Sequence, residues 1–344
     1  MAVGSNFDAW TSLTLDDAMH EAISRILSSG QTIKASRGAL LELQGTVFRI
    51  DNPRTRLSLS AERSVLFSAV GELLWYLRGS SALKVISYYL PVYKKDSSDG
   101  YTIHGAYGPR ILDSGGHDQL ANVIKLLKAK PTTRRAVISL FRPDDISRER
   151  KEVPCTVSLQ FMIRDGRLNC IATMRSNDAI LGLPHDVFTF TMLQEIIARE
   201  VNVGLGYYQH AAASFHIYTD QIDKAGKYLA EGLQSTKIEM PKMDDTPMAQ
   251  WLPVMLDIER HFRKFKRDDE QSSWLSMRLA ELPVFWQDIA RILAIFRYTR
   301  NNSTEEWVDA ARRLLDDFSD PIYENFVQAK IDKHPDNSPQ LDLK

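Results

Sequence analysis

The spacing of apolar positions along the chain changes between a helical period of about 3.6 residues and a strand period of two. After Thr14, apolar side chains recur at helical spacing until Gly30, and Asp17 completes a capping box with Thr14. These features predict a helix. We interpret residues 31–38 as a polar loop and residues 39–50 as the first strand.

The same two periods predict the remaining elements of the first part of the chain. Helices are expected over 61–77, 117–128, 186–201 and 219–233, and strands over 136–141, 156–163, 167–173, 207–215 and 236–240. From residue 247 onward, only helical spacing remains, marked by Trp251, Trp286 and Trp307. We therefore predict an α/β (α+β) fold in residues 1–245, with a mixed sheet flanked by helices, and an all-helical extension in residues 246–344.

Composition narrows the class of substrate. The 344 residues carry a formal net charge of −1, which gives no field to attract a nucleic acid, so an anionic substrate must be bound by a few local arginines. Two cysteines are too few for a disulfide scaffold and lack metal-site spacing, so we expect no metal and a reducing cytoplasm. The longest apolar stretch, 67–77, is too short to cross a membrane, and residues 1–10 lack a leader pattern.

Candidate chemistry gathers between residues 153 and 186. The expected hairpin over residues 156–173 places the thiol of Cys155 near Arg175, and Asp186 follows shortly after. A nucleophile, a cation and an acid in one neighbourhood suit chemistry on an anionic substrate. Cys170 is interpreted as a small core residue. Glu72 interrupts an otherwise apolar helix, which favours a functional role over a position on the helix surface.

The chain resembles the thymidylate synthase family over residues 15–240. The resemblance rests on several ordered segments: ELLWYLRG at 72–79, YG at 107–108, RRAVIS at 134–139, VPC at 153–155, MRSND at 174–178, GLPHD at 182–186 and SFHIY at 214–218. It implies a homodimeric enzyme that uses 5,10-methylenetetrahydrofolate and a pyrimidine nucleotide. The first 245 residues would then be the catalytic domain, whereas the resemblance does not cover the helical extension.

The resemblance assigns roles to four catalytic residues. Cys155 would add as a thiolate to C6 of the pyrimidine, with Arg175 lowering the thiol pKa. Glu72 would organise water and protons beside the base, and Tyr107 would take part in removing the C5 proton. Asp186 would read the base, although an aspartate near a helix start is also typical of an N-terminal cap.

The remaining implied contacts are to the phosphate, the sugar, the base and the folate. Arg175 and Ser176 would bind the phosphate, together with Arg134 and Arg135 from the neighbouring subunit. Arg37 is a further phosphate candidate, with a solvated loop arginine as the alternative. His216 and Tyr218 would reach a sugar hydroxyl, Asp178 the folate, and Gly182 would allow close approach to the base. An ordinary turn aspartate and an ordinary turn glycine are the alternatives for the last two. Asn177 would support the polar network or shape the turn.

Two departures from the family pattern bear on the substrate. Thr156 follows the cysteine where a synthase acting on deoxyuridylate has histidine, and Asp186 replaces the asparagine that reads uracil. Both are similar to the cytidylate hydroxymethylase branch, and a carboxyl group can accept from the 4-amino group of cytosine and share a proton with N3. We therefore expect C5-hydroxymethylation of CMP or dCMP, as phage DNA modification or nucleoside-antibiotic biosynthesis requires. The alternatives are a thymidylate synthase methylating dUMP and a non-catalytic nucleotide-binding regulator.

Overall fold

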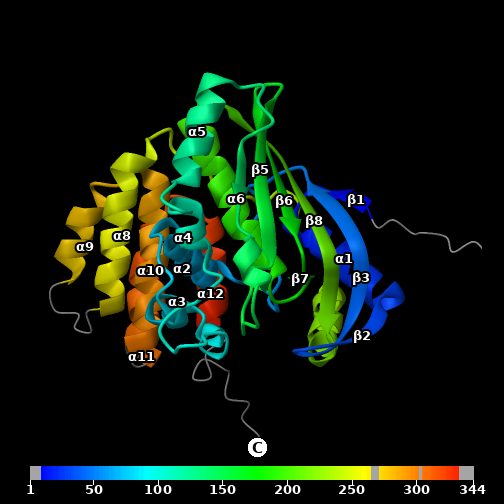
Figure 1. Cartoon of the computed structure of the whole chain (residues 1–344). Coiled ribbons are helices and arrows are strands. Elements are labelled where there is room, and N and C mark those ends of the chain that lie inside the picture. The colour runs from blue at the N-terminus through cyan, green and yellow to red at the C-terminus, as the bar shows by residue number, and fades with distance from the viewer. Residues whose placement is uncertain (1–8, 265–270, 302–303, 333–344) are drawn as a thin grey trace, which may run out of the picture. The chain divides into compact units, whose positions relative to one another are not determined.

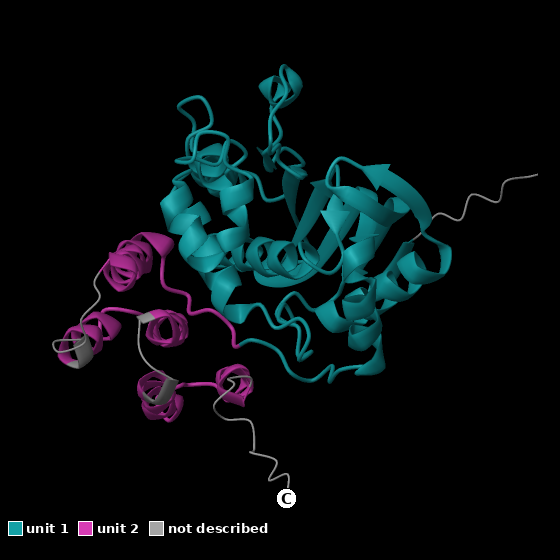
Figure 2. Ribbon diagram, turned by 90° about the horizontal axis from the view of Figure 1, so that it is seen from below, with its two compact units in different colours: residues 1–240 teal, residues 241–344 magenta. Residues whose placement is uncertain are grey.

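The structure is a computed structural model that describes residues 9–264, 271–301 and 304–332. It consists of two compact units, residues 1–240 and residues 241–344, shown in teal and magenta in Figure 2. Most of the N-terminal segment that was expected to lack a leader, residues 1–8, lies outside the described residues. Each unit is described separately below.

The first unit is built on a mixed sheet of eight strands (Figure 1). The strands are β1 (Ala9–Ser12), β2 (Gln31–Ala35), β3 (Gly38–Ile50), β4 (Val137–Ser139), β5 (Thr156–Arg164), β6 (Arg167–Met174), β7 (Asn177–Asp178) and β8 (Gly204–Tyr218). Their order across the sheet is β1-β3-β8-β6-β5-β4, with β2 added to β3 and β7 added to β8. The pairs β1–β3, β6–β8 and β7–β8 are parallel and the others antiparallel.

Helices of the first unit connect and cover these strands. They are α1 (Leu15–Ser29), α2 (Leu66–Leu77), α3 (Leu83–Tyr89), α4 (Tyr107–Leu112), α5 (Gln119–Ala129), α6 (Leu183–Glu200) and α7 (Ile222–Ala230), with short 3₁₀ turns η1 (Pro91–Lys95), η2 (Pro143–Ile146) and η3 (Thr219–Gln221). Helix α1 packs on β3, and α6 packs on β6 and β8 and also against α2. This confirms the predicted mixed sheet flanked by helices.

The two faces of the sheet differ in burial. One row of side chains across three neighbouring strands is fully buried and consists of Phe48, His210 and Ala172. The next row along the same strands is partly exposed and consists of Val47, Ala211 and Thr173. Because successive residues of a strand point to opposite faces, one face of the sheet forms the core and the other remains open within this chain.

Local signals in the sequence placed two elements correctly. The hydroxyl of Thr14 accepts from the backbone N–H of Asp17 at 3.0 Å, and Asp17 accepts in return, so the predicted capping box begins α1. The predicted hairpin is β5–β6. Its two-residue turn, Asp165 and Gly166, has positive φ at both positions (50° and 69°), as the tight turn of a right-twisted hairpin requires.

Other boundaries differ from the prediction. The expected polar loop at 31–38 contains strand β2, which pairs with β3 through backbone bonds that need no apolar pattern. Helix α2 begins at Leu66 rather than residue 61, and α6 begins at Leu183 with Pro184 in its first turn. Residues 236–240 form no strand; the N–H of Met240 instead donates to the carbonyl of Arg54.

The second unit is helical throughout its described residues. Its helices are α8 (Met248–Lys264), α9 (Gln271–Leu279), α10 (Val284–Asn301), α11 (Thr304–Leu315) and α12 (Ile322–Asp332). The rings of Trp251 and Trp286 stack with centroids 3.6 Å apart, which joins α8 to α10. Among the described residues of the whole chain, no helix combines the length and the apolar character needed to cross a membrane.

Candidate active site

The thiol of Cys155 lies on the segment that leads into β5, beside the end of β6. The N–H of Arg175 donates to the carbonyl of Cys155 at 2.8 Å. The guanidinium of Arg175 is held by the carbonyls of Val153 and Pro154, each at 2.8 Å, and its Nη2 lies 3.7 Å from Cys155 Sγ. The hairpin therefore brings the thiol and the cation together, as its register predicted.

Burial dominates the acidity of this thiol. Loss of solvation raises the pKa of Cys155, Arg175 acts against that rise, and the carboxyls of Asp186 and Glu152 add to it, with a smaller opposing effect of Arg37. Arg175 therefore lowers the pKa of the thiol as expected, but burial outweighs this effect, so the pKa of Cys155 is raised overall. An exposed guanidinium is partly screened by water and does not offset the cost of burying a thiolate.

Asp186 faces the same neighbourhood from the first turn of α6. Burial, followed by the nearby charge of Glu72, raises the pKa of Asp186 to about 8, against the effect of a 2.6 Å hydrogen bond from Asn177 Nδ2 to Asp186 Oδ2. This carboxyl is consequently protonated at neutral pH. The alternative interpretation as a helix cap is wrong, because the cap position of α6 is Gly182 and the N–H of Asp186 already donates to the Gly182 carbonyl.

Glu72 is buried in α2 with 4% of its surface exposed, so the helix-surface alternative is also wrong. Its Oε1 accepts from the hydroxyl of Tyr93 at 2.6 Å and from that of Tyr76 at 3.2 Å. Burial raises the pKa of Glu72, and the two phenol hydrogen bonds work against the rise because they favour the carboxylate. Glu72, buried, and Asp186, half-buried, are thus two carboxyls from two helices that pack together.

Tyr107 begins α4 and connects the thiol segment to these helices. Its hydroxyl accepts a 3.0 Å hydrogen bond from the N–H of Thr156, the residue after Cys155. Its ring contacts that of Tyr76, with centroids 5.1 Å apart. Burial, then the neighbouring Cys155 and Asp186, raises the pKa of Tyr107 well above its ordinary value, so the hydroxyl keeps its proton.

A second group lies where β7 pairs with β8. Asp178 is opposite His216 in this parallel pair, and its Oδ1 accepts from the N–H groups of Ile180 and Leu181 at 2.7 and 2.6 Å. Asp178 Oδ2 is buried and has no partner among the described residues. The rings of His216 and Tyr218 meet edge to face at 5.1 Å, so these two side chains do share a face.

The absence of a side chain at Gly182 lets Asn177 and Asp186 lie close to the backbone of this turn. A Cβ at Gly182 would lie 3.3 Å from Asn177 Nδ2 and 3.5 Å from Asp186 Oδ2. Asn177 Oδ1 is also buried without a partner among the described residues. Two buried oxygen acceptors, from Asn177 and Asp178, are therefore without a partner among the described residues, and that of Asn177 belongs to the side chain that binds Asp186.

The predicted phosphate contacts are more dispersed. Arg37 lies on the turn between β2 and β3 and pairs with Asp96, at 2.7 Å between Nη2 and Oδ1. Arg134 and Arg135 precede β4 with exposed side chains, and no hydrogen bond or ion pair described for the chain links those side chains to Cys155. Ser176, between Arg175 and Asn177, is half-buried. The structure therefore brings Arg175 together with Cys155 and Asp186, and no described contact links the side chains of the tandem arginines to this group within one chain.

Comparison with known proteins is consistent with this arrangement. The sequence model of a family described as thymidylate synthase matches residues 17–259. The chain belongs to the thymidylate synthase family. The match covers the entire constellation from Glu72 to Tyr218.

Individual relatives within the thymidylate synthase family carry two descriptions. Deoxyuridylate hydroxymethyltransferases of Pseudomonas phage M6 and Delftia phage PhiW-14 are 35% and 31% identical over 192 and 215 residues, which is 52% and 58% of this chain and 55% and 59% of those proteins. A thymidylate synthase of Francisella philomiragia is 29% identical over 178 residues, 47% of this chain and 65% of that protein. The chain thus spans between half and two thirds of the length of these relatives.

Sequence reasoning missed three residues of this thymidylate synthase-like site. Tyr76 and Tyr93 bind Glu72, and Glu152 lies on the thiol segment, where it accepts from the N–H of Gly105 at 2.7 Å. Burial raises the pKa of Glu152, with the charge of Asp96 adding to the rise. The tyrosine-rich stretch before Tyr107 was visible in the sequence, but nothing in its spacing distinguished these tyrosines from packing residues.

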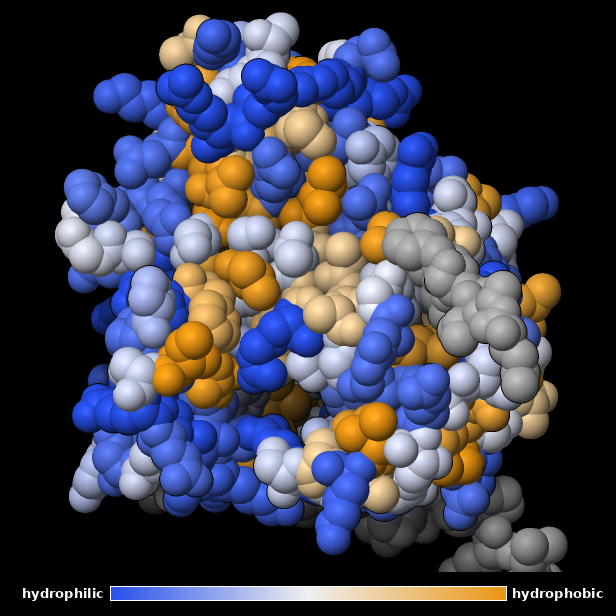
Figure 3. Space-filling view, turned by 45° about the vertical axis from the view of Figure 1, so that its right-hand side comes forward, coloured by the Kyte–Doolittle hydropathy of each residue, from blue (hydrophilic) through white to orange (hydrophobic). Residues whose placement is uncertain are grey.

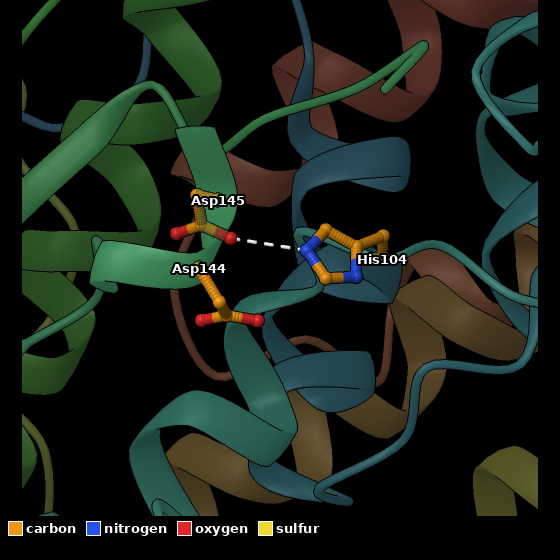
Figure 4. A group of neighbouring side chains, drawn as sticks. All are labelled: His104, Asp144 and Asp145. Atoms are coloured by element: carbon orange, nitrogen blue, oxygen red, sulfur yellow. Dashed lines mark hydrogen bonds and ion pairs between the residues drawn. The ribbon is translucent and has the colours of Figure 1, made fainter. Parts of the chain in front are cut away.

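One cluster near the site has the residue types of a metal centre. His104, Asp144 and Asp145 place potential ligand atoms within 4.8 Å of one another (Figure 4). Both oxygens of Asp145 already accept from the buried guanidinium of Arg110, at 2.6 and 2.7 Å, and His104 Nε2 lies 3.0 Å from Asp145 Oδ1. Because a guanidinium takes the place beside the carboxylate that a cation would need, this cluster is better explained as an ion pair that fixes the start of η2.

Proposed function

We propose that the protein hydroxymethylates C5 of a cytidine monophosphate, CMP or dCMP, with 5,10-methylenetetrahydrofolate as the one-carbon donor. Membership of the thymidylate synthase family supports chemistry at C5 of a pyrimidine nucleotide. The observation that carries the choice of base is the protonated carboxyl of Asp186, whose pKa is raised to about 8. The overall reaction consumes the nucleotide, methylenetetrahydrofolate and water, and releases the hydroxymethyl nucleotide and tetrahydrofolate.

Covalent activation is assigned to Cys155. Addition of its thiolate sulfur to C6 breaks the conjugation of the ring and moves electron density to C5, which then forms a bond to the one-carbon unit. Because burial raises the pKa of this thiol, its proton passes to water as sulfur attacks C6, and a proton returns to sulfur when it leaves C6. Arg175 at 3.7 Å stabilises the developing negative charge on sulfur. Departure of sulfur at the end restores the aromatic ring.

Base recognition is assigned to Asp186 with Asn177. A protonated carboxyl presents one O–H donor and one acceptor, which complements the N3 acceptor and 4-amino donor of cytosine. The hydrogen bond from Asn177 Nδ2 to Asp186 Oδ2 orients that carboxyl. Uracil presents a donor at N3 and an acceptor at O4, so it would require the carboxyl proton on the opposite oxygen from the one that serves cytosine.

Proton movements are assigned to Glu72 and Tyr107. The Glu72 carboxyl, fixed by Tyr93 and Tyr76, lies close enough to Asp186 to influence its pKa and can exchange protons with water beside the base. Tyr107 keeps its own proton at neutral pH, so it can accept the C5 proton only by passing its hydroxyl proton to a neighbour. When bound, methylenetetrahydrofolate supplies the one-carbon unit, and the unpartnered Oδ2 of Asp178 fits a hydrogen-bond donor on that molecule.

The phosphate would be bound by Arg175 and Ser176 of one chain and by Arg134 and Arg135 of a second, in a homodimer. Two observations support this arrangement: both tandem arginines are exposed, and one face of the sheet remains partly open. Figure 3 shows apolar patches among polar ones on one side of the molecule, a composition compatible with an interface between copies. His216 and Tyr218 would hold the sugar.

Mixing two inactive variants tests the shared site. A Cys155→Ala chain keeps its arginines, and an Arg134→Ala/Arg135→Ala chain keeps its thiol, so a mixed dimer has one complete site. Refolding the two together should restore up to about a quarter of the wild-type activity, because half of the dimers are mixed and each has one working site of two. No recovery in verified mixed dimers would contradict the shared site.

Product analysis tests the choice of base. The protein is incubated with methylenetetrahydrofolate and each of CMP, dCMP, UMP and dUMP, and the nucleotides are weighed. We expect a mass gain of one CH₂O unit on a cytidine nucleotide only. A uridylate as the only substrate would overturn the proposal.

The second candidate is hydroxymethylation or methylation of dUMP. The phage relatives described as deoxyuridylate hydroxymethyltransferases favour it, as does the relative described as a thymidylate synthase. A product heavier by CH₂ would indicate the methylating reaction, and one heavier by CH₂O on dUMP would indicate the phage-like reaction. The same incubation thus separates all three outcomes.

A further inference from the structure

Arg37 is engaged by a carboxylate that the proposed reaction does not use. Its Nη2 lies 2.7 Å from Asp96 Oδ1 and 3.4 Å from the carbonyl of Lys151. Asp96 follows η1 and is 18% exposed at its side chain, whereas the Arg37 side chain is 55% exposed. The carboxylate is therefore fixed in the protein, and the guanidinium remains open to solvent on its other side.

The pair lies beside the candidate active site. Lys151 is four residues before Cys155, and its ammonium donates to the carbonyl of Ser97 at 3.3 Å. The segments around residues 96 and 151 are therefore joined directly by this bond and again through Arg37. On the other side, a Cβ added at Gly38, the residue after Arg37, would lie 4.0 Å from the ring of Tyr218. Arg37 thus sits between the thiol segment and the end of β8 that carries the proposed sugar-binding residues.

We propose that Asp96 competes with the nucleotide phosphate for the guanidinium of Arg37. This competition sets the affinity of the site for phosphate monoesters. This inference rests on the proposed function, together with the expectation from the sequence that Arg37 is a further phosphate contact. A carboxylate and a phosphate offer the guanidinium the same acceptor geometry. The phosphate carries up to two negative charges and the carboxylate carries one, so the phosphate displaces the carboxylate. The Arg37–Asp96 pair is open to solvent on the Arg37 side, which makes it weak enough to be exchanged.

The exchange distinguishes classes of ligand. A nucleoside carries no charge that could replace the carboxylate on Arg37, so its affinity should not depend on Asp96. A nucleotide or inorganic phosphate must compete with the carboxylate, so its affinity should rise when that competitor is removed. Asp96 is therefore a specificity-determining residue for the phosphate group rather than for the base.

Equilibrium binding to Asp96→Asn tests this role without any turnover. CMP, cytidine and inorganic phosphate are titrated into the wild type and the variant by calorimetry. We expect CMP and inorganic phosphate to bind about two- to fivefold more tightly to the variant, the range of an exposed ion pair, and cytidine to bind equally to both. Arg37→Ala should weaken CMP and phosphate binding and remove the effect of Asp96→Asn in the double variant.

A matched control comes from the opposite end of β3. Arg49 and Asp51 form an ion pair of similar length, 2.6 Å, with both side chains partly exposed. Asp51→Asn removes the same charge without touching the site and should leave all three affinities unchanged. Thermal unfolding of each variant establishes that it is folded, and Asp96→Ser replaces Asp96→Asn if the amide destabilises the loop.

Three results would overturn the inference. Weaker binding of CMP to the folded Asp96 variant would mean that the carboxylate supports Arg37 in its binding position. Unchanged phosphate affinity would mean that the pair does not compete with the ligand. Equal tightening by Asp51→Asn would mean that net charge alone is responsible. If the reaction on cytidylate fails while UMP or dUMP is converted, the same titrations with the accepted nucleotide and its nucleoside still decide the role of Asp96.

Discussion

The two ends of the candidate site handle charge in opposite ways. At the end proposed to face the base, Glu72 and Asp186 are carboxyls whose pKa values burial has raised, and hydrogen bonds from the chain fix both. At the end proposed to face the phosphate, Arg37 and Arg175 are exposed cations. The raised pKa values bring ionisation of the carboxyls closer to neutral pH, so pH should govern recognition of the base. Salt screens the exposed guanidinium groups, so ionic strength should govern recognition of the phosphate.

The largest effect is expected for Cys155→Ala at the boundary between the two ends. Turnover should fall by roughly 10⁴-fold or more, because no other group can form the bond to C6. Nucleotide binding should persist, since Asp186 and Arg175 are unchanged. Product mass spectrometry and calorimetry measure the two quantities, and Cys170→Ala, which removes the buried thiol of β6, should retain activity. Full turnover by Cys155→Ala would exclude covalent catalysis through this residue.

Asp186→Asn should reverse the base preference. The value of kcat/KM for cytidylate should drop by about 10²-fold or more, because an amide has no acidic proton to share with N3 of cytosine, while uridylate should improve. In the wild type, activity on cytidylate should fall as pH rises through about 8, where Asp186 loses its proton. The variant should lack this alkaline fall. An unchanged ratio of the two substrates would refute base reading by the carboxyl.

The same ionisation predicts a stability difference. A raised carboxyl pKa in the folded protein means that stability is fully present at acidic pH and is lost as pH rises toward about 8. Asp186→Asn should remove that loss, so the difference in melting temperature between variant and wild type should change across this range. Parallel stability profiles would indicate that Asp186 ionises normally.

Tyr93→Phe should produce a moderate change at the base-facing end. Removal of the 2.6 Å hydrogen bond to Glu72 takes away a group that favours the carboxylate, so the pKa of Glu72 should rise further. The acid limb of kcat should move to higher pH, and kcat at neutral pH should fall by about tenfold, as for a hydrogen bond to a charged group. Tyr101→Phe, in an 80% exposed position, is the control and should leave the profile unmoved.

Salt should have the smallest effect, and only at the phosphate-facing end. Raising the ionic strength toward about 1 M shortens the screening length to about 3 Å, so the KM for the nucleotide should rise a few-fold with kcat unchanged. Binding of the corresponding nucleoside should not respond. A similar response of nucleoside and nucleotide would remove the distinction between the two ends.

The sequence predicted contacts that depend on local geometry. A two-residue turn fixes the β5–β6 register, so the proximity of Cys155 and Arg175 follows from the order of residues along the chain. Asp178 and His216 could not be paired in this way, because the parallel pair β7–β8 depends on a long connection through α6. Tyr93 and Glu152 were missed because they come from segments whose apolar positions show no period.

Electrostatic consequences were harder to predict than positions. Arg175 was placed correctly, yet the pKa of Cys155 is raised, because the extent of burial is a property of the whole fold. For the same reason, the sequence could not show that Asp186 is protonated or that Asp96 pairs with Arg37. Strand β2 was missed because its side chains are polar and its stability comes from backbone pairing with β3.

The complete burial of Cys170 has a practical consequence. Its thiol has no exposed surface and a pKa raised by burial, whereas Cys155 is half-buried at the site. An alkylating reagent should therefore label the folded protein once, and a nucleotide that covers position 155 should prevent it. Counting mass adducts would then report occupancy of the site directly, even for ligands that are never converted.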